Sequence, residues 1–418
     1  MKNSMEEPYR HSPCENNAVS FIIRSIPMAY TYDSRNITQG DHFICLPGGE
    51  PYINAAKEKG AASVLHMSRS ELATFANKHF DYPSHPLKVV GVTGTNGKTT
   101  VTHLVADALN KAGYKTAILG TLNASLTTPE SWDIAKKMSE HLADGGTHFV
   151  MEVSSHGIAQ NRILGIKFHV KLLTNISQDH LDYHKTFEAY EQTKRSFMQD
   201  GDGINLYPEE YQKTPLDFTV PLLGRFNYEN MQAAATILNR LGLSEGQIRE
   251  SLSAAHAPRG RFESIDEGQP YRVIVDYAHT PDGLRNVLQT ARDITPDAHV
   301  LVLFGCGGDR DRTKRPEMGR IAYNLSDYTV ITSDNPRTED PHMIINDILT
   351  GLPPTIEQTR CSIIPDRRTA IRHILEKAQP GDLVMLAGKG HETYQITQSG
   401  TQHFDDREEA IAALKDLA

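Results

Sequence analysis

Residues 87–100, LKVVGVTGTNGKTT, decide the fold that we expect for this chain. A β-branched run leads into a glycine-rich turn, and from Thr99 a helical pattern continues to about Lys111. A strand, a glycine turn and a helix in this order predict a phosphate-binding loop, in which backbone N–H groups and the helix N-terminus hold phosphate oxygens. Lys98 would reach the terminal phosphates and the Thr99 hydroxyl would face Mg²⁺. The spacing departs from the common G-x-x-x-x-G-K-[ST], because Val92 stands five residues before Gly97.

Strand and helix patterns alternate downstream of this loop, which is typical of a parallel α/β sheet. The alternation starts again after residue 260, so we expect a second doubly wound unit with its ligands at the carboxyl ends of the strands. The expected strands lie at residues 115–120, 148–153, 170–176, 271–278, 299–305, 328–334 and 382–388, and two of the expected helices at residues 281–294 and 367–377.

Two boundaries divide the chain. The segment DYPSHP at residues 81–86 has two prolines in six residues, which is typical of a linker, and HAPRG at residues 256–260 precedes the second unit. We therefore expect an α/β fold of three domains. These are a small N-terminal α/β domain (1–86), a central P-loop ATPase-like parallel-sheet domain (87–258) and a C-terminal Rossmann-like domain (259–418).

Composition excludes several classes of protein. Of the 418 residues, 39% are hydrophobic and 23% are charged, which argues against a disordered chain, and a net charge of −9 argues against a nucleic-acid coat. No run approaches the ~18 apolar residues of a membrane helix, and the N-terminus lacks the apolar region of a signal peptide. The cysteines are far apart and form no CxxC, which indicates free thiols in a reducing cytosol: Cys14, Cys45, Cys306 and Cys361. We expect a cytoplasmic monomer without membrane or nucleic-acid partners.

A second group of residues predicts a metal site. Glu152 lies at the end of a predicted strand in MEVSSHG (151–157), and His180 and Asp182 follow another strand in TNISQDHLDYH (174–184). A hard cation beside a nucleotide takes such oxygen ligands, with an occasional imidazole. A structural role is the better interpretation for any one of them alone, but their shared position beside a phosphate loop favours metal binding.

The other loops at predicted strand ends are less specific. Lys194, in EAYEQTKRSF (188–197), is by itself an ordinary helix lysine exposed to solvent. Arg337, in TSDNPRTED (332–340), suits bidentate carboxylate binding, and a surface ion pair is the alternative. GKGHETYQ (388–395) is similar to a phosphate loop but lacks a Ser or Thr after Lys389.

Taken together, seven motifs resemble those of the Mur ligase family, in the family's order and over roughly residues 30–410. They are TGTNGKT, MEVSSHG, TNISQDHLDYH, DYAHTP, FGCGGDRD-x-x-KRP, DNPRTE and GKGHE-x-YQ. The chain is most similar to the members that add meso-diaminopimelate as the third residue of the peptidoglycan stem peptide.

The resemblance implies small-molecule substrates, ATP and Mg²⁺ as cofactors, and a role for each matching residue. The implied catalytic residues are Lys98, Glu152, His180 and Lys194, and the metal ligands are Thr99, Glu152, His180 and Lys194 as a carbamate. The implied ATP-binding residues are Gly94, Thr95, Asn96, Gly97, Lys98, Thr99, Thr100, Asn227, Arg261 and Asp276. Those for the muramoyl dipeptide are Ser34, Thr127, Thr128, Ser154 and Arg162, and those for the diamino acid are Arg310, Asn335, Arg337, Gly388 and Glu392.

The implied reaction is ATP-driven, ADP-forming amide synthesis in peptidoglycan precursor assembly. A substrate carboxylate attacks the γ-phosphate to give an acyl phosphate, and the amine of the incoming amino acid then displaces phosphate. The enzyme's contribution is positioning and the screening of phosphate charge.

Two segments are shorter than the family pattern. Asp33–Ser34–Arg35 is present, but the segment after it is only LPGGEPYINAA (46–56), and about 30 residues separate Lys194 from GRFNYEN (224–230).

Three interpretations of the function stay open. The first is a ligase acting on the UDP-linked muramoyl dipeptide. The second is a trimmed paralogue that joins an amino acid to a carboxylate without UDP in a specialised pathway. The third is a non-enzymatic nucleotide-binding partner, which the complete set of phosphate and metal residues disfavours.

Overall fold

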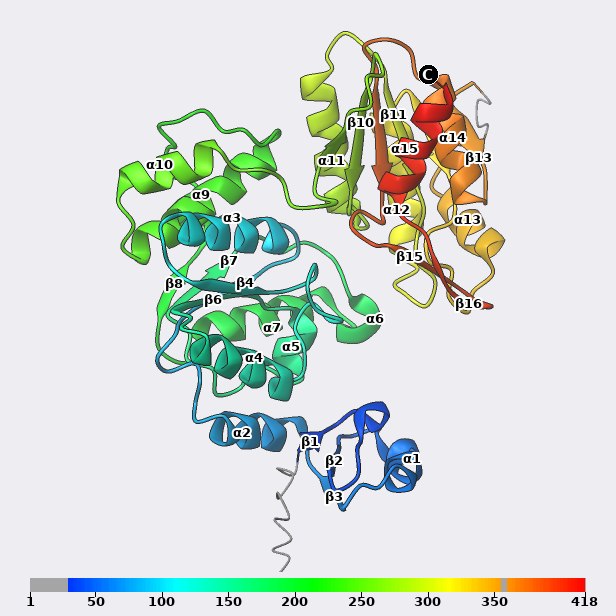
Figure 1. The fold of residues 1–418 in the computed structure, drawn as a ribbon. Helices are drawn as coiled ribbons and strands as arrows, with labels where there is room; N and C mark the ends of the chain where they lie inside the picture. Colours follow the sequence, from blue (N-terminus) through cyan, green and yellow to red (C-terminus); the bar gives the residue numbers. More distant parts are fainter. Residues whose placement is uncertain (1–28, 355–358, 418) are drawn as a thin grey trace, which may run out of the picture. The chain divides into compact units, whose positions relative to one another are not determined.

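The computed structural model describes residues 29–354 and 359–417. They form two compact units, one ending at Ser68 and the other beginning at Arg69 (Figure 1). In this part of the chain no helix has the length and apolarity needed to cross a membrane. The expected division into three domains at residues 86–87 and 258–259 remains a prediction.

The first unit is a small α/β layer. Its parallel sheet has the order β1-β2-β3, and the helix α1 (Ile53–Glu58) contacts β2. The strands are Tyr30–Thr31, His42–Cys45 and Ser63–His66. Asp33 caps the short η1 (Ser34–Asn36) by accepting a hydrogen bond from the Arg35 amide, and its carboxylate also pairs with the exposed Arg35 guanidinium.

The second unit begins with α2 (Arg69–His79), which packs against α4 (Ser131–Ala143). Residues 81–86 do not form a loose linker. Ser84 is buried, and its hydroxyl accepts a hydrogen bond from the Lys167 amide at 3.0 Å. The proline-rich segment is therefore fixed to the second unit.

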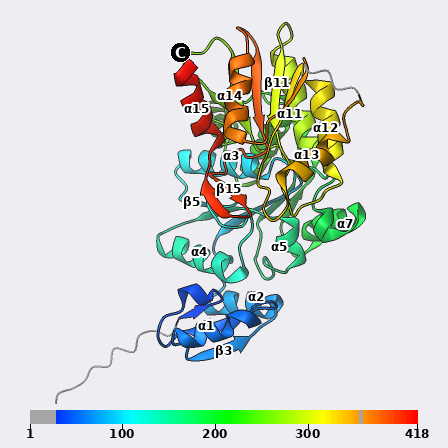
Figure 2. The ribbon, with the colours of Figure 1, turned by 90° about the vertical axis from the view of Figure 1, so that its right-hand side faces the viewer.

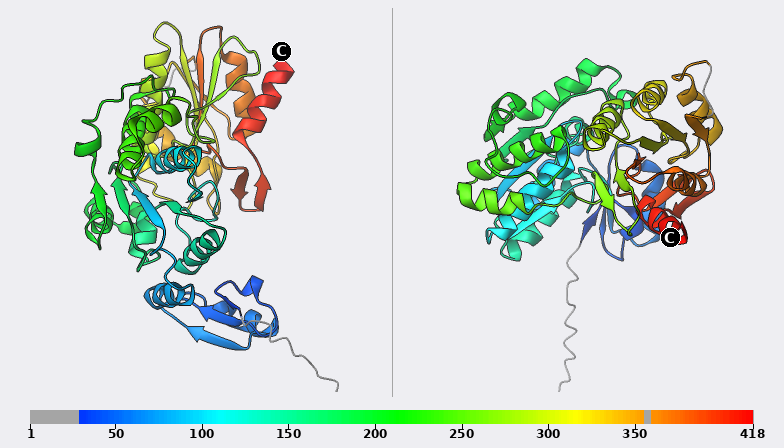
Figure 3. Two further views of the ribbon diagram at one scale, coloured as in Figure 1. Left: turned by 60° about the vertical axis from the view of Figure 1, so that its left-hand side comes forward. Right: turned by 90° about the horizontal axis from the view of Figure 1, so that it is seen from above.

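The first sheet of this unit is fully parallel, with the order β5-β6-β4-β7-β8. Its strands are β4 (Lys88–Thr93), β5 (Thr116–Leu119), β6 (His148–Glu152), β7 (Val170–Leu173) and β8 (Ile204–Leu206). The inner strands are buried apolar runs because helices cover both faces. Figures 1 and 3 show α3 (Lys98–Lys111), α9 (Arg225–Arg240) and α10 (Glu245–Ser253) on one face. The other face carries α4, α5 (Ser155–Ala159) and α7 (Phe187–Gln199), with the short α6 (Leu181–His184) beside α7. The short α8 (Pro208–Tyr211) packs against α9.

The second sheet has the order β13-β12-β11-β14-β10-β9. Its strands are β9 (Glu263–Ile265), β10 (Arg272–Asp276), β11 (Val300–Phe304), β12 (Tyr328–Ile331), β13 (Cys361–Ile363) and β14 (Leu383–Ala387). Two apolar cores lie on its two faces (Figure 2), one with α11 (Pro281–Ile294), α12 (Lys314–Leu325) and α13 (Pro341–Leu349) and one with α14 (Arg367–Lys377) and α15 (Asp406–Leu417). The edge strand β9 runs antiparallel to β10, whereas the sequence pattern predicted only parallel strands. A small hairpin, β15 (Tyr394–Thr397) and β16 (Gly400–His403), follows β14.

A fully buried ion pair joins α14 to α15. Arg367 donates from Nε and Nη2 to the two carboxylate oxygens of Asp406 at 2.7 and 2.6 Å. Its guanidinium also donates to the carbonyls of Ser333 and Ala387, at the ends of β12 and β14. The same pair therefore fixes two helices and two strand ends.

We expect Arg367→Met to lower the free energy of unfolding by about 3–5 kcal/mol, because Asp406 would remain buried without its partner. The matched control is Arg368→Met, which breaks the exposed Arg368–Glu409 pair between the same two helices and should cost less than about 1 kcal/mol. Urea unfolding of both variants measures the difference. Equal small losses would show that the buried pair does not hold the helices.

Candidate active site

The loop between β4 and α3 has the backbone of a phosphate-binding site. Gly94 and Gly97 have φ of +143° and +85°, and a Cβ at Gly97 would lie 2.4 Å from Asn230 Oδ1. Lys98 Nζ folds over the loop and donates to the carbonyls of Gly94 and Thr95 at 2.9 and 2.8 Å. The N-terminus of a 14-residue helix opens at the same point, which favours an anion there.

A cavity of about 790 Å³ lies over this loop. Its walls include the loop residues Thr95–Thr100, together with side chains that follow β6, β7 and β10. The carboxyl ends of strands from both sheets of the second unit therefore meet around one space. A volume of this order accommodates a nucleotide with part of a second substrate.

Glu152, the last residue of β6, has its carboxylate against the loop. The Thr99 hydroxyl donates to it at 3.1 Å, and Thr121 donates from its amide at 2.8 Å. This carboxylate and hydroxyl fit Mg²⁺, which takes oxygen ligands and completes its shell with water and substrate phosphates. The described residues contain no cluster of three or more His, Cys, Asp or Glu side chains that could hold a metal.

His180 lines the same cavity from the loop after β7. Its φ is +56°, and its Nε2 lies 3.4 Å from a carboxylate oxygen of Asp179. Burial lowers the pKa of His180, which favours the neutral ring that a metal ligand needs. Asp182, which we considered as an oxygen ligand, is exposed, and the buried Asp179 lines the cavity in its place. Both residues stand in the same QDHLD segment, so the sequence had no signal that separated them.

Lys194 is buried, contrary to the ordinary interpretation of a lysine on a helix. Its Nζ donates to the Gly94 carbonyl at 2.8 Å and lies 4.8 Å from the centre of the Tyr190 ring. Burial, together with the nearby charge of Lys98, lowers the pKa of Lys194 well below its usual value. A neutral amine is the form that reacts with CO₂, and the carbamate implied by the resemblance stays a prediction.

The residues expected to bind the muramoyl dipeptide come together in the second unit, except Ser34, which belongs to the first. The Thr128 hydroxyl donates to the Glu152 carbonyl at 3.0 Å and accepts from the Ser154 amide at 2.9 Å. Arg162 donates to the Thr128 carbonyl at 2.8 Å, and the Thr127 hydroxyl lies 3.0 Å from that of Thr121. They surround the end of the strand that carries Glu152.

Two of the three residues expected at adenosine line the cavity. Arg261 donates to the Thr99 hydroxyl at 2.9 Å, and its guanidinium lies 4.6 Å from the centre of the Tyr277 ring. Asp276 accepts from the Phe262 amide at 2.7 Å, and burial raises the pKa of Asp276 to about 6.

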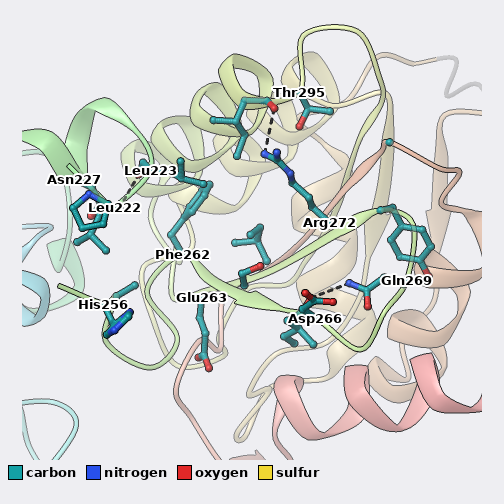
Figure 4. A pocket seen from close by; sticks show the side chains of 18 of the residues that line it. Leu222, Leu223, Asn227, His256, Phe262, Glu263, Asp266, Gln269, Arg272 and Thr295 are labelled. Carbon is teal, nitrogen blue, oxygen red and sulfur yellow. Dashed lines mark hydrogen bonds between the residues drawn. The ribbon is translucent and has the colours of Figure 1, made fainter. Parts of the chain in front are cut away.

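The third residue, Asn227, lines a different cavity of about 1350 Å³, where it donates to the Leu223 carbonyl at 2.8 Å (Figure 4). Asn230, one turn further along α9, lines the cavity over the phosphate loop and donates to Asn227 Oδ1 at 3.3 Å. Sequence reasoning missed Asn230, although its spacing of three residues from Asn227 puts both on one helix face.

The residues expected to bind the diamino acid lie in two groups, one around Glu392 and one around Gly307. Glu392 accepts from Asn335 Nδ2 at 2.8 Å and from the buried Lys389 at 3.2 Å, and Lys389 was not among the expected site residues. A second contact lies around Gly307: a Cβ there would be 2.9 Å from Arg337 Nη1 and 3.6 Å from Arg310 Cγ. Gly388 (φ +113°) comes close to Asp334, because a Cβ on it would lie 2.8 Å from Asp334 Oδ2.

Comparison with known proteins accounts for this arrangement. The Mur ligase middle domain matches residues 92–207, and the Mur ligase glutamate ligase domain matches residues 260–390. The chain is 38% identical to UDP-N-acetylmuramoyl-L-alanyl-D-glutamate–2,6-diaminopimelate ligase of Syntrophomonas wolfei, with 92% of this chain and 94% of the relative covered. This chain belongs to the Mur ligase family. The ligase of the same name from Nostoc sp. is 40% identical to this Mur ligase, with 90% of this chain and 91% of the relative covered.

Solved structures show the same fold. A UDP-N-acetylmuramoyl-L-alanyl-D-glutamate–2,6-diaminopimelate ligase is 29% identical, with a TM-score of 0.57, and 93% of this Mur ligase and 95% of that chain are covered. Thermotoga maritima MurF, solved with ADP, is 15% identical with a TM-score of 0.65, and 94% of this Mur ligase and 99% of that chain are covered. The alignment with the S. wolfei relative extends over 463 residues, more than the 418 of this chain, so the relative has internal segments that are missing here.

We expect Lys98→Ala to lower kcat by about 10³-fold or more, because a cation on the transferring phosphoryl group is lost. Phosphate release under saturating substrates measures the rate, and urea unfolding checks that the fold is intact. Lys111→Ala, at the opposite and exposed end of α3, is the control and should keep the wild-type rate. A Lys98→Ala enzyme with wild-type turnover would contradict the assignment of residues 94–99 as a phosphate-binding loop.

Proposed function

We propose that this Mur ligase joins meso-diaminopimelate to a carboxylate of UDP-N-acetylmuramoyl-L-alanyl-D-glutamate, with conversion of ATP to ADP and phosphate. One observation carries the proposal: Lys98, Thr99, Glu152 and Lys194 converge on the phosphate loop of a chain that is 36–40% identical to ligases of that name. Because ATP is supplied in the cytoplasm, we propose that compartment for the reaction.

The first step activates the acceptor. A carboxylate oxygen attacks the γ-phosphorus of ATP, the bond to the β,γ-bridging oxygen breaks, and an acyl phosphate and ADP result. The loop amides, the α3 N-terminus and Lys98 would hold the phosphates, and Thr128, Ser154 and Arg162 would hold the acceptor beside them. Mg²⁺ held by Thr99, Glu152, His180 and carbamylated Lys194 would screen the charge of the phosphates when bound.

The second step forms the amide. The amine of the diamino acid attacks the acyl carbon and forms a C–N bond, and the amine loses a proton. The bond between the acyl carbon and the phosphate oxygen breaks, and inorganic phosphate leaves. Asn335, Gly388 and Glu392 would orient the amino acid for this attack. The enzyme's gain would come from proximity, because binding would hold the amine and the acyl phosphate together in a reactive orientation.

Lys194 enters the proposal as a modified residue. Its neutral amine attacks the carbon of CO₂, an N–C bond forms, and one proton leaves to water, which converts the side chain into an anionic carbamate. An ammonium in the same place would repel Mg²⁺ and compete with Lys98 for the Gly94 carbonyl. Carbamylation therefore changes a repulsive group into a metal ligand.

We expect Lys194→Ala to be nearly inactive and to regain part of its activity with added acetate or formate. The added carboxylate would occupy the space left by the lysine and replace the anionic oxygens of the carbamate. Phosphate release with and without acetate measures the rescue. An alanine variant with normal activity and no response to acetate would exclude the carbamate.

A second candidate acceptor, a related carboxylate without UDP, is favoured by the short first unit. The described part of that unit, residues 29–68, has three strands of at most four residues. Phosphate release from paired reactions, with the UDP-linked dipeptide and with the same muramoyl dipeptide lacking UDP, decides between the acceptors. A strong preference for the UDP-linked form supports the first proposal, and equal kcat/KM supports the second.

We expect meso-diaminopimelate to be preferred over lysine by about 30- to 1,000-fold in kcat/KM. The two differ by a distal carboxylate, which the half-buried Arg337 can grip with two charge-assisted hydrogen bonds, while the ammonium of lysine meets a like charge. Arg337→Ala should raise the KM for diaminopimelate and reduce the preference. Equal kcat/KM values for the two amino acids would show that Arg337 does not read a distal carboxylate.

A further inference from the structure

Lys171 is a buried lysine that the proposed mechanism does not use. It lies on β7 with 1% of its surface exposed, and its Nζ donates only to main-chain carbonyls. Two of these belong to Phe197 and Met198 at 3.3 Å, and the third belongs to Asp200. All three carbonyls are at the C-terminal end of α7, which ends at Gln199.

The last carbonyls of a helix have no partner within the helix, and they carry the negative end of its dipole. A buried ammonium that donates to three of them satisfies these groups and fixes the helix end in direction as well as in position. An apolar side chain of similar volume would fill the space but would form none of these hydrogen bonds. Because these carbonyls would lose their donor, an apolar replacement should also lower stability, so a test of any further role needs a readout besides stability.

The end of α7 is also packed closely on the strand that leads to the phosphate loop. Gly91 of β4 is the register partner of Lys171 on β7. A Cβ at Gly91 would lie 2.6 Å from the Phe168 ring and 2.8 Å from the Phe197 ring. Lys171 Nζ is itself 5.7 Å from the centre of the Phe197 ring. Gly91 on β4 and Lys171 on β7 therefore form the surface against which the end of α7 packs, and we call this surface the seat.

This seat is one helical turn from Lys194. The capped carbonyls of Phe197 and Met198 follow Lys194 by three and four residues, and Gly91 precedes Gly94 by three. Lys194 Nζ meets the Gly94 carbonyl at 2.8 Å. A shift of the end of α7 relative to β4 would therefore change the distance between Lys194 and the phosphate loop.

We propose that Lys171 is a positioning residue, which holds the end of α7 on β4 and β7 and so sets the place of the Lys194 side chain beside the phosphate loop. The inference rests on the proposed function, in which Lys194 acts as a carbamate. Lys171 acts through Lys194 and touches neither substrate nor phosphate.

Two variants disturb the seat by different routes. Lys171→Met keeps the apolar stem and removes the three hydrogen bonds, whereas Gly91→Ala keeps Lys171 and forces Phe168 or Phe197 away. The control is Lys115→Met, which removes a lysine that donates to the Asp144 carbonyl at the end of α4, a helix without proposed site residues. Having two routes keeps the test valid if one variant fails to fold.

We expect both seat variants to lower kcat by at least about tenfold, because misplacement of a reacting group by an ångström costs this much or more. The KM for ATP should change by less than about twofold, since the loop amides and Lys98 are unaltered. Labelling with ¹³C-bicarbonate should show a carbamate signal in the wild type and in Lys115→Met, and a weaker signal in both seat variants. Folded variants with wild-type kcat and carbamate signal, or with only a lower melting temperature, would overturn the inference.

A double variant tests whether Lys171 acts through Lys194. In the acetate-rescued Lys194→Ala enzyme, adding Lys171→Met should change the rate by less than about twofold, because the side chain to be positioned is gone. A further tenfold loss in that background would show that Lys171 acts elsewhere and would overturn the inference. Lys194→Ala alone tests the proposed function, so the two failures are distinguishable.

Discussion

The amines of Lys98 and Lys194 donate to the same carbonyl oxygen, and the rest of the site depends on how two cationic groups are accommodated so close together. Lys98 and Lys194 donate to the oxygen of Gly94 at 2.9 and 2.8 Å. Burial lowers the pKa of both amines, and the nearby charge of Lys98 lowers the pKa of Lys194 further. The ligation chemistry offers each lysine a different solution. Phosphate oxygens supply a counter-charge to Lys98, and CO₂ converts Lys194 into an anion.

The fold makes this meeting of lysines possible because the phosphate loop and the acidic and histidine side chains beside it lie at one edge of the first sheet. Glu152 ends β6, the phosphate loop follows β4, and Asp179 and His180 follow β7. The helix α7, which carries Lys194, lies on a face of that sheet (Figure 1). A helix on the face of a sheet slides more easily than a strand within it, because strands are held by ladder hydrogen bonds. Extra anchoring by Lys171 and by close packing at Gly91 is therefore expected at α7.

Much of the fold could be predicted from the sequence, because buried parallel strands and amphipathic helices leave clear periodic patterns. The observed α11 and α14 have the predicted bounds, 281–294 and 367–377. The strands β8, β9, β13, β15 and β16 were missed, since they are short and partly polar and depend on their neighbours for pairing. At the site, the motifs predicted Lys98 and Glu152, which follow directly from strand ends. Lys171, Asp179 and Asn230 were missed, because a polar residue's burial depends on tertiary packing that no local pattern contains.

The small first unit and the phosphate site contribute to different steps, substrate binding in the first case and phosphoryl transfer in the second. Contacts to a nucleotide remote from the reacting carboxylate contribute the same binding energy in the ground state and in the transition state. Losing some of them raises KM and leaves the chemical step intact. Phosphate and metal contacts act on charge that develops during the reaction, so losing one of them lowers kcat itself. A Mur ligase can therefore lack segments of its relatives while every residue around Gly94 remains, and its retained reaction is compatible with a reduced grip on the UDP end of the acceptor.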